Sequence, residues 1–272
     1  MRLEDKKIIL LREAGGISKM ALADVMHTDE NKVNKVEKGL AQYTDAQVVN
    51  AKKFFKIEGM PLSDFECAVY KKRLYMLHDY IRDRRFDEAR ALCDEMAKLI
   101  NLEDCDNDLP ILYRLFEVAA LIYCYNNLDA AERELDYLKR RISGMTQEHM
   151  YHYYFYTGTL LLIRGSYYES LDLYKQAHEL SNSLSFLTPE DVKRLHLGIA
   201  SCFSRLEYPN RAIFYMLETY ELYSNRNRKI SIIDIHFDCL LAQNYVFVNE
   251  FEKAEKLLNN CLVSAKTIED DF

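Results

Sequence analysis

Apolar residues recur at helical spacing along almost the whole chain, in short segments first and in longer ones afterwards. In the first 58 residues this spacing predicts four helices, at 6–13, 19–26, 30–38 and 45–55. The last three are preceded by residues whose side-chain oxygens can accept from the free amides of the next turn: Ser18, Asp29 and Thr44. Gly39 follows the third helix, where a positive φ is common. The short turn between the second and third helices makes them a candidate helix-turn-helix.

Beyond Gly59-Met60-Pro61, which interrupts the helical pattern, the chain repeats. Small residues recur at intervals of 42, 39, 42 and 42, at Ala89, Ala131, Ser170, Ala212 and Ala254. Twelve residues before each stands a second residue, small in four of the five cases: Leu77, Ala119, Gly158, Ala200 and Ala242. Because two antiparallel helices approach closely where both carry small residues, the pattern predicts helical hairpins. Five fit, at about 66–102, 110–143, 148–183, 189–225 and 230–267.

Composition supports an all-α protein. Only 8 Gly and 4 Pro occur in 272 residues, too few to punctuate an all-β or α/β chain, and the 49% of hydrophobic residues excludes a disordered one. Seven cysteines with no C-x-x-C pair indicate reduced thiols. With no apolar signal segment and no apolar run of membrane length, we expect a soluble cytoplasmic protein.

Charge is distributed unevenly between residues 1–65, which we call the head, and residues 66–272, which we call the body. The net charge of −7 argues against a generally cationic nucleic-acid binder, but residues 1–65 carry 11 basic and 10 acidic side chains, while the remainder carries 25 and 33. The head is therefore near neutral on an acidic body, which permits a head that meets phosphate.

The head resembles the Cro/C1-repressor (XRE) helix-turn-helix family over about its first 57 residues. The matching residues are Leu11-Arg12, Gly16, Ser18, Leu22-Ala23, Val33 and Val36-Glu37-Lys38-Gly39. The resemblance implies that the third helix lies in the major groove, with Lys19 facing phosphate. The DNA-binding candidates that it implies are Lys19, Asn31, Lys32, Asn34, Lys35 and Lys38.

Two departures from that family leave an alternative open. Lys19 stands where the family usually has Gln, and Asp29 and Glu30 stand where Arg or Ser is usual. Phosphate repels acidic groups, although these can accept from cytosine N4 and also suit a helix N-terminus. The alternative is a degenerate helix-turn-helix used only for dimerisation or partner contact.

The body resembles the tetratricopeptide repeat, in a form longer than the usual 34 residues. The resemblance implies a right-handed α-solenoid of about five hairpins whose first helices line the concave face. The side chains expected there are Arg82, Tyr113, Phe116, Glu117, Ala120, Tyr123, His152, Phe155, Tyr156, Thr159, Arg194, Ser201, Arg205, His236, Gln243, Asn244 and Phe247. Rings, amides and guanidinium groups suit an extended peptide, whereas the alternative for any one of them is packing between repeats.

No catalytic motif is present, so we expect no enzyme and no cofactor. His149 and His152 share a helix face, but without a matching cluster they indicate hydrogen-bonded or solvated histidines rather than a metal site.

Head and repeats together resemble the Gram-positive peptide-pheromone regulators, the Rgg/PlcR/PrgX group. The resemblance implies a cytoplasmic homodimeric transcription factor that binds a short signalling peptide and two DNA half-sites. Its domains would be a DNA-binding domain at 1–58, a linker at 59–65 and a repeat domain at 66–272. The alternative is a repeat protein that binds a protein partner such as a kinase or response regulator, as in the related Rap-type proteins.

Overall fold

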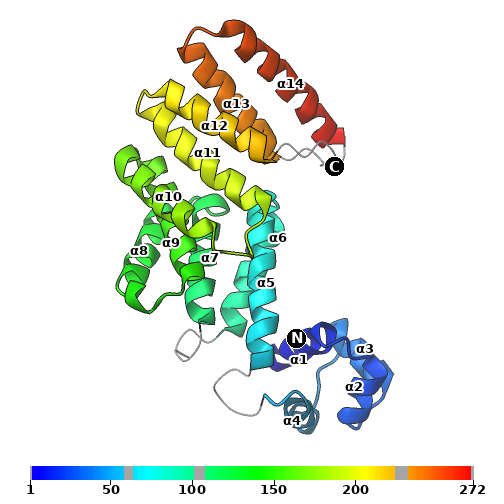
Figure 1. The fold of residues 1–272 in the computed structure, drawn as a ribbon. Coiled ribbons are helices and arrows are strands. Elements are labelled where there is room, and N and C mark those ends of the chain that lie inside the picture. Colours follow the sequence, from blue (N-terminus) through cyan, green and yellow to red (C-terminus); the bar gives the residue numbers. More distant parts are fainter. Residues whose placement is uncertain (1, 58–63, 101–107, 224–231, 271–272) are drawn as a thin grey trace. The chain divides into compact units, whose positions relative to one another are not determined.

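The chain is all-helical over the residues that the computed structural model describes, 2–57, 64–100, 108–223 and 232–270 (Figure 1). Over those ranges there is no strand. The predicted fold class is thereby confirmed. None of the helices in these ranges is both long and apolar enough to cross a membrane.

Four helices form the head: α1 (Leu3–Ala14), α2 (Lys19–Val25), α3 (Glu30–Glu37) and α4 (Asp45–Phe54). The three predicted N-caps are confirmed, because Ser18 accepts from the Ala21 amide, Asp29 from Lys32 and Thr44 from Gln47. Gly39 has a φ of +73°. The head core consists of apolar side chains with no more than 1% exposure: Ile8, Leu11, Leu22, Met26, Val33 and Val36.

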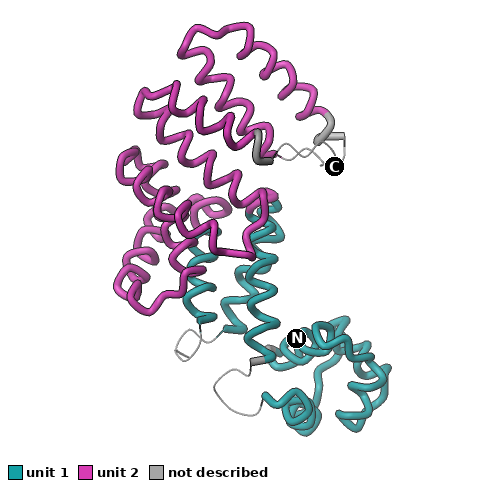
Figure 2. The backbone as a smooth tube through the Cα atoms, in the orientation of Figure 1, with its two compact units in different colours: residues 1–81, 85–120 teal, residues 82–84, 121–272 magenta. Residues whose placement is uncertain are grey.

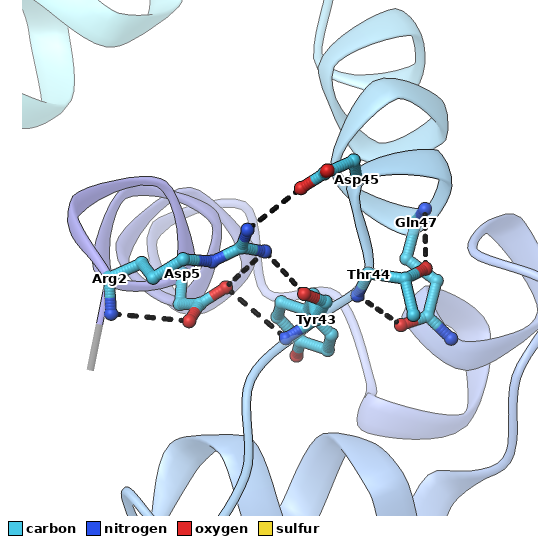
Figure 3. A network of polar contacts seen from close by, with 6 residues as sticks. All are labelled: Arg2, Asp5, Tyr43, Thr44, Asp45 and Gln47. Atoms are coloured by element: carbon cyan, nitrogen blue, oxygen red, sulfur yellow. Dashed lines mark hydrogen bonds and ion pairs between the residues drawn. The ribbon is translucent and has the colours of Figure 1, made fainter.

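A buried carboxylate joins the start of α1 to the segment before α4 (Figure 3). Asp5 is fully buried and accepts from the amides of Arg2, at 3.3 Å, and Tyr43, at 3.4 Å. The Arg2 guanidinium in turn donates to the Tyr43 carbonyl and, at 2.8 Å, to Asp45. The Asp5 charge is therefore satisfied by two amides and a guanidinium, as a buried carboxylate requires.

Over the described ranges, ten helices follow the head as five helix–turn–helix segments, at the places expected for the five hairpins. They are α5 (Asp64–Arg82) with α6 (Phe86–Leu99), α7 (Leu109–Tyr123) with α8 (Leu128–Lys139), α9 (Gln147–Arg164) with α10 (Tyr167–Ser181), α11 (Pro189–Arg205) with α12 (Pro209–Tyr223), and α13 (Ile232–Phe247) with α14 (Phe251–Asp270). A short 3₁₀ turn, η1 (Ile142–Gly144), precedes α9. The small landmark residues in the second helices are all buried, with exposures between 0% and 2%.

Each hairpin turn contains one residue with left-handed backbone, always five positions before the small landmark. The φ values are +60° at Arg84, +50° at Asn126, +88° at Gly165, +64° at Glu207 and +61° at Asn249. The amide of the following residue closes each turn by donating back to the carbonyl of the first helix, as from Tyr208 to Phe203 at 2.9 Å. Four of these bonds span five residues, whereas the bond from Asn127 to Leu121 spans six. The left-handed residue at a fixed position is therefore the feature that all five turns share.

The chain divides into two compact units (Figure 2). Unit 1 contains residues 1–81 and 85–120, which include the head, and unit 2 contains residues 82–84 and 121–272. Within unit 1, Lys7 of α1 forms an ion pair with the buried Glu66 of α5. Unit 2 contains the hairpins α9–α10, α11–α12 and α13–α14 together with α8.

Candidate DNA- and peptide-binding sites

The third head helix, α3, has one buried apolar side and one polar side open to solvent. Val33 and Val36 are fully buried in the head core. The polar candidates divide by exposure: Asn31, Lys35 and Lys38 are exposed, and Lys32 and Asn34 are half-buried. An N-capped helix with an accessible Asn/Lys side has the chemistry of a major-groove reader, because amides read adenine and lysine reads guanine.

A polar network behind α3 holds the remaining candidate. The Glu37 carboxylate lies 2.7 Å from Arg12 Nε and 2.7 Å from Lys19 Nζ. Lys19 Nζ also donates to Asn34 Oδ1 at 2.7 Å. Arg12 completes the network by donating to the Ile17 carbonyl at 3.0 Å. The network joins α1, α2 and α3, and it already supplies Lys19 with a negative partner.

The acidic start of α3 has a local structural role. The Asp29 carboxylate accepts from the Lys32 amide at 2.7 Å, and Glu30 is exposed in the first turn. Both groups lie at the positive end of the helix dipole, where acidic side chains are stabilising. Capping therefore accounts for Asp29 by itself.

In unit 2, the Arg194 guanidinium of α11 lies among aromatic side chains from two other helices. Its carbon is 5.3 Å from the centre of the Tyr123 ring and 5.5 Å from that of Phe155. Burial would lower the pKa of Arg194, but the nearby Tyr123, Tyr156 and Asp191 outweigh it, so the pKa is raised and the cation is retained. A fixed guanidinium beside half-buried Tyr123 can bind a carboxylate or a peptide carbonyl.

Two further arginines in unit 2 belong to the same region. Arg82 lies 3.4 Å from Thr188 Oγ1 and 3.7 Å from Asp191 Oδ1, at the N-terminus of α11. Arg84 lies 2.8 Å from His236 Nε2. Burial, together with repulsion from Arg194, lowers the pKa of Arg84. Arg84 was not predicted, because nothing in its turn position distinguishes it from other exposed arginines.

The predicted groove residues fall into two classes. Those that are exposed or half-buried are Arg82, Glu117, Tyr123, Arg194, Ser201, Arg205, His236, Gln243 and Phe247. Those that are buried are Tyr113, Phe116, Ala120, His152, Phe155, Tyr156, Thr159 and Asn244. The residues of the second class pack inside the fold, as where the Phe155 ring of α9 lies with its centre 5.8 Å from that of the Tyr174 ring of α10.

Tyr174 of α10 takes part in this packing, and it was not among the residues predicted from the sequence. Its hydroxyl donates to Thr159 Oγ1 at 3.0 Å. A Cβ added at Gly158 would lie 3.2 Å from the Tyr174 ring, and one added at Gly198 would lie 2.6 Å from it. Gly158 was recognised from the sequence as one of the small landmark residues. That position 198 also requires a residue without a Cβ follows only from the Tyr174 ring, which lies between α9 and α11.

A surface pocket of about 440 Å³ lies elsewhere in unit 2. Tyr168, Asp172 and Lys175 of α10 form one wall, and Phe203, Tyr208 and Arg211 form the other. None of its lining residues belongs to the predicted groove.

His149, one of the two histidines considered as metal ligands, has a local role in capping a helix. His149 belongs to the N-terminal capping box of α9, with its ring nitrogen accepting from the Thr146 amide at 3.5 Å. Among the residues with described positions, no three His, Cys, Asp or Glu side chains form a group that could hold a metal ion.

Comparison with known proteins shows likeness at the level of structure. No protein-family model matches the chain, and no curated protein matches it. A solved structure of a Rap protein complexed with competence and sporulation factor is similar, with a TM-score of 0.64 and 19% identity, over 75% of this chain and 56% of that one. The apo form of the quorum sensor NprR from B. thuringiensis has a TM-score of 0.58 and 18% identity, over 70% of this chain and 52% of that one.

A third similar structure spans the whole chain. It is PlcR from Bacillus thuringiensis in complex with the peptide PapR7 and DNA, with a TM-score of 0.53 and 14% identity over 99% of both chains. This chain spans only about half the length of the Rap and NprR structures. At these identities the likeness establishes the fold, which is a TPR-like helical-repeat fold.

Proposed function

We propose that the protein is a peptide-responsive, DNA-binding transcriptional regulator of the quorum-sensing type. In this proposal residues 1–58 bind DNA, residues 59–65 link the domains, and residues 66–272 bind a short signalling peptide. The protein acts in the cytoplasm as a homodimer on two half-sites. The likeness to PlcR over 99% of both chains supports this assignment, because that structure contains both a peptide and DNA.

The observation that carries the proposal is the arrangement of α3. Its apolar side chains are fully buried in a four-helix head, its start is capped by Asp29, and Asn31, Lys35 and Lys38 face solvent. A helix placed in this way enters the major groove with its first turns at the base edges. Lys32 lies on the first turns as well, and its half-buried stem positions the ammonium group.

The peptide half of the proposal rests on unit 2. Arg194 offers a charge for a carboxylate, and the half-buried Tyr123 ring beside it offers a flat surface for a side chain. Exposed Gln243 and His236 supply further polar groups for an extended main chain. A bound peptide orders these helices and thereby changes the preferred separation of the two heads in the dimer. Because the two DNA half-sites have a fixed spacing, that separation decides whether both heads can bind.

Direct binding assays test the DNA half. We expect Lys32→Ala/Lys35→Ala to weaken binding to duplexes tiled from the region upstream of the gene and to reduce the salt slope by about one unit per lost phosphate contact. The matched control is Lys52→Ala/Lys53→Ala, which removes the same charge from α4 of the same head. Equal effects of the two double variants would show a general charge effect and contradict reading by α3.

Peptide binding is tested by thermal shift against synthetic peptides from short reading frames that neighbour the gene. A binding peptide should raise the Tm of the wild-type protein and leave the Tm of Arg194→Met unchanged. Arg133→Ala, which removes an exposed arginine from α8, should respond like the wild type. If Arg194→Met responds fully, the peptide does not use this site.

One observation favours a second function, a repeat protein that binds a protein partner. Glu37 already neutralises Lys19, and Asp29 and Glu30 place two acidic groups at the start of α3. In that case the head docks on a protein, and Lys32→Ala/Lys35→Ala leaves DNA affinity and its salt slope unchanged.

A further inference from the structure

The last hairpin, α13–α14, contains two cysteines that the proposed function does not use. Cys239 lies on α13 and is exposed, whereas Cys261 lies on α14 with only 6% of its surface exposed. Both thiols are free. They lie on the two helices of one hairpin, which are joined by the turn around Asn249 and pack against each other.

The geometry of an antiparallel hairpin directs the two side chains toward each other. Cys261 Sγ donates to the Ile235 carbonyl at 3.8 Å, so Cys261 lies level with the turn of α13 that precedes Cys239. Side chains on a helix lean toward its N-terminus. Cys261 therefore leans toward the hairpin turn and Cys239 leans away from it, which reduces the separation of the two side chains along the helix axes.

The surroundings of the two thiols differ in a useful way. Burial, followed by a hydrogen bond with Cys239, raises the pKa of the Cys261 thiol to about 12. Cys261 is therefore a thiol at neutral pH, and it must give up its proton in any step in which its sulfur is the nucleophile. Cys239 is accessible to small oxidants and stands beside a second thiol, which is the arrangement of a sensing and a resolving cysteine.

We propose that Cys239 and Cys261 are a peroxide-sensitive pair that closes to a disulfide between α13 and α14. In the first step the Cys239 thiolate attacks hydrogen peroxide, an S–O bond forms, the O–O bond breaks and hydroxide leaves. The Cys261 sulfur then attacks the Cys239 sulfenic acid and gives up its proton. The S–S bond forms, the S–O bond breaks and the oxygen leaves as water. Two thiols and one hydrogen peroxide thus give one disulfide and two waters.

The bond would tie the second helix of the last hairpin to the first. Oxidation should therefore slow hydrogen exchange in α14 around Cys261, because local opening of that helix now requires the cross-link to move with it. Dithiothreitol should restore the original exchange rates, since the cross-link is reversible.

The test is peptide mapping of the intact wild-type protein after brief treatment with hydrogen peroxide. We expect a monomer whose mass is lower by two hydrogen atoms, with one cross-linked peptide pair containing Cys239 and Cys261. Cys239→Ser should abolish the cross-link. Cys67→Ser, which removes another partly accessible cysteine, should leave it in place. Cys261→Ser should abolish the cross-link as well. The test does not depend on that variant, because the peptide map is made with wild-type protein.

Three results would overturn the proposal. One is Cys239 oxidised to sulfinic acid while Cys261 remains a thiol. Another is a disulfide from Cys239 to a second chain, seen as a dimer on a non-reducing gel. The last is a cross-link that uses any cysteine other than these two.

Discussion

Charged side chains inside the head are arranged as matched sets rather than single pairs. The side chains of Arg12 and Glu37 are only 11% and 12% exposed, and Glu37 uses both oxygens, one for Arg12 and one for Lys19. A buried guanidinium that loses its carboxylate costs more than the pair contributes, because its charge remains desolvated. Glu37 therefore fixes the position of α3 against α1 and α2.

Glu37→Gln should destabilise the head by about 2 kcal/mol, because the amide cannot neutralise Arg12. Hydrogen exchange of the α1–α3 amides measures this as faster local opening. Glu13→Gln is the matched control, since Glu13 also lies 3.2 Å from Arg12 but has a 57% exposed side chain. Equal effects of the two substitutions would contradict the role given to Glu37.

A second set of linked side chains consists of the half-buried His178 and the buried His196 and Thr219. Thr219 donates its hydroxyl proton to the Tyr215 carbonyl, at 2.8 Å, so His196 Nδ1 must donate to Thr219, also at 2.8 Å. His196 Nε2 is then left to accept from His178 Nδ1, at 3.3 Å. Burial, and next the neighbouring His178, lower the pKa of His196 to about 4. The packed structure holds His196 neutral.

This histidine makes stability depend on pH. In the unfolded chain His196 takes a proton below about pH 6.5, and in the folded chain only near pH 4. Its contribution is therefore complete above pH 6.5 and is lost as the pH falls toward 4, by about 3 kcal/mol in all. Burial also lowers the pKa of His178, and the nearby Glu179 and Glu218 oppose this with a smaller rise.

Urea unfolding at several pH values measures this dependence. His196→Gln should flatten the slope between pH 6.5 and 4, whereas replacing the exposed His27, as in His27→Asn, should retain it. An unchanged slope in His196→Gln would assign the dependence to other groups.

At the scale of elements, consecutive hairpins are joined by an aromatic ring placed between two glycines. Tyr174 of α10 packs against Gly158 of α9 and Gly198 of α11, and its hydroxyl donates to Thr159. The helices approach closely there because neither glycine has a Cβ. The period of the small residues predicted the contact within the hairpin but not the one to the next hairpin.

Gly198→Ala should destabilise unit 2 by about 2 kcal/mol, since its Cβ would lie 2.6 Å from the Tyr174 ring. Gly158→Ala should cost less, because there the closest ring atom is 3.2 Å away. Gly144→Ala is the control, with no atom within 4 Å of the added Cβ. Denaturant midpoints rank the three variants, and a Gly198→Ala midpoint equal to that of Gly144→Ala would refute the close packing.

The hairpin turns show how far residue type predicts an element. The turns were located from the spacing of small residues, and Gly165 is the expected residue at a left-handed position. Arg84 and Glu207 take the same backbone conformation although neither favours it. There the hydrogen bond back to the first helix and the packing of the two helices decide the conformation, and no local preference signals it.

At the scale of the whole molecule, unit 2 is held by a core that adjacent hairpins share. Phe237 of α13 is fully buried with Ala200 of α11 and Ala212 and Met216 of α12. In a helical repeat each hairpin contacts its neighbours, so stability is a sum of repeat terms and interface terms. Loss of one interface side chain should therefore loosen two hairpins together.

Phe237→Ala should cost about 3–5 kcal/mol and raise hydrogen exchange in α11–α14 together. Phe214→Ala removes a ring that is 66% exposed on α12 and should have little effect. Increased exchange confined to α13 would argue against coupling between these hairpins.

The helical fold, the capped head helices and the five hairpins could be predicted from the amino-acid sequence, because periodicity, N-cap residues and small residues act through neighbours close in the chain. Arg194 and Tyr123 were also predicted from the sequence as site residues, and they lie together in the structure. The packing of the folded chain settled which groove candidates are buried, that Glu37 neutralises Lys19, and that Cys261 lies against the carbonyl of Ile235, one helical turn before Cys239. These outcomes depend on which side chains from distant segments meet, and a helical period fixes the face on which a residue lies without fixing what covers that face.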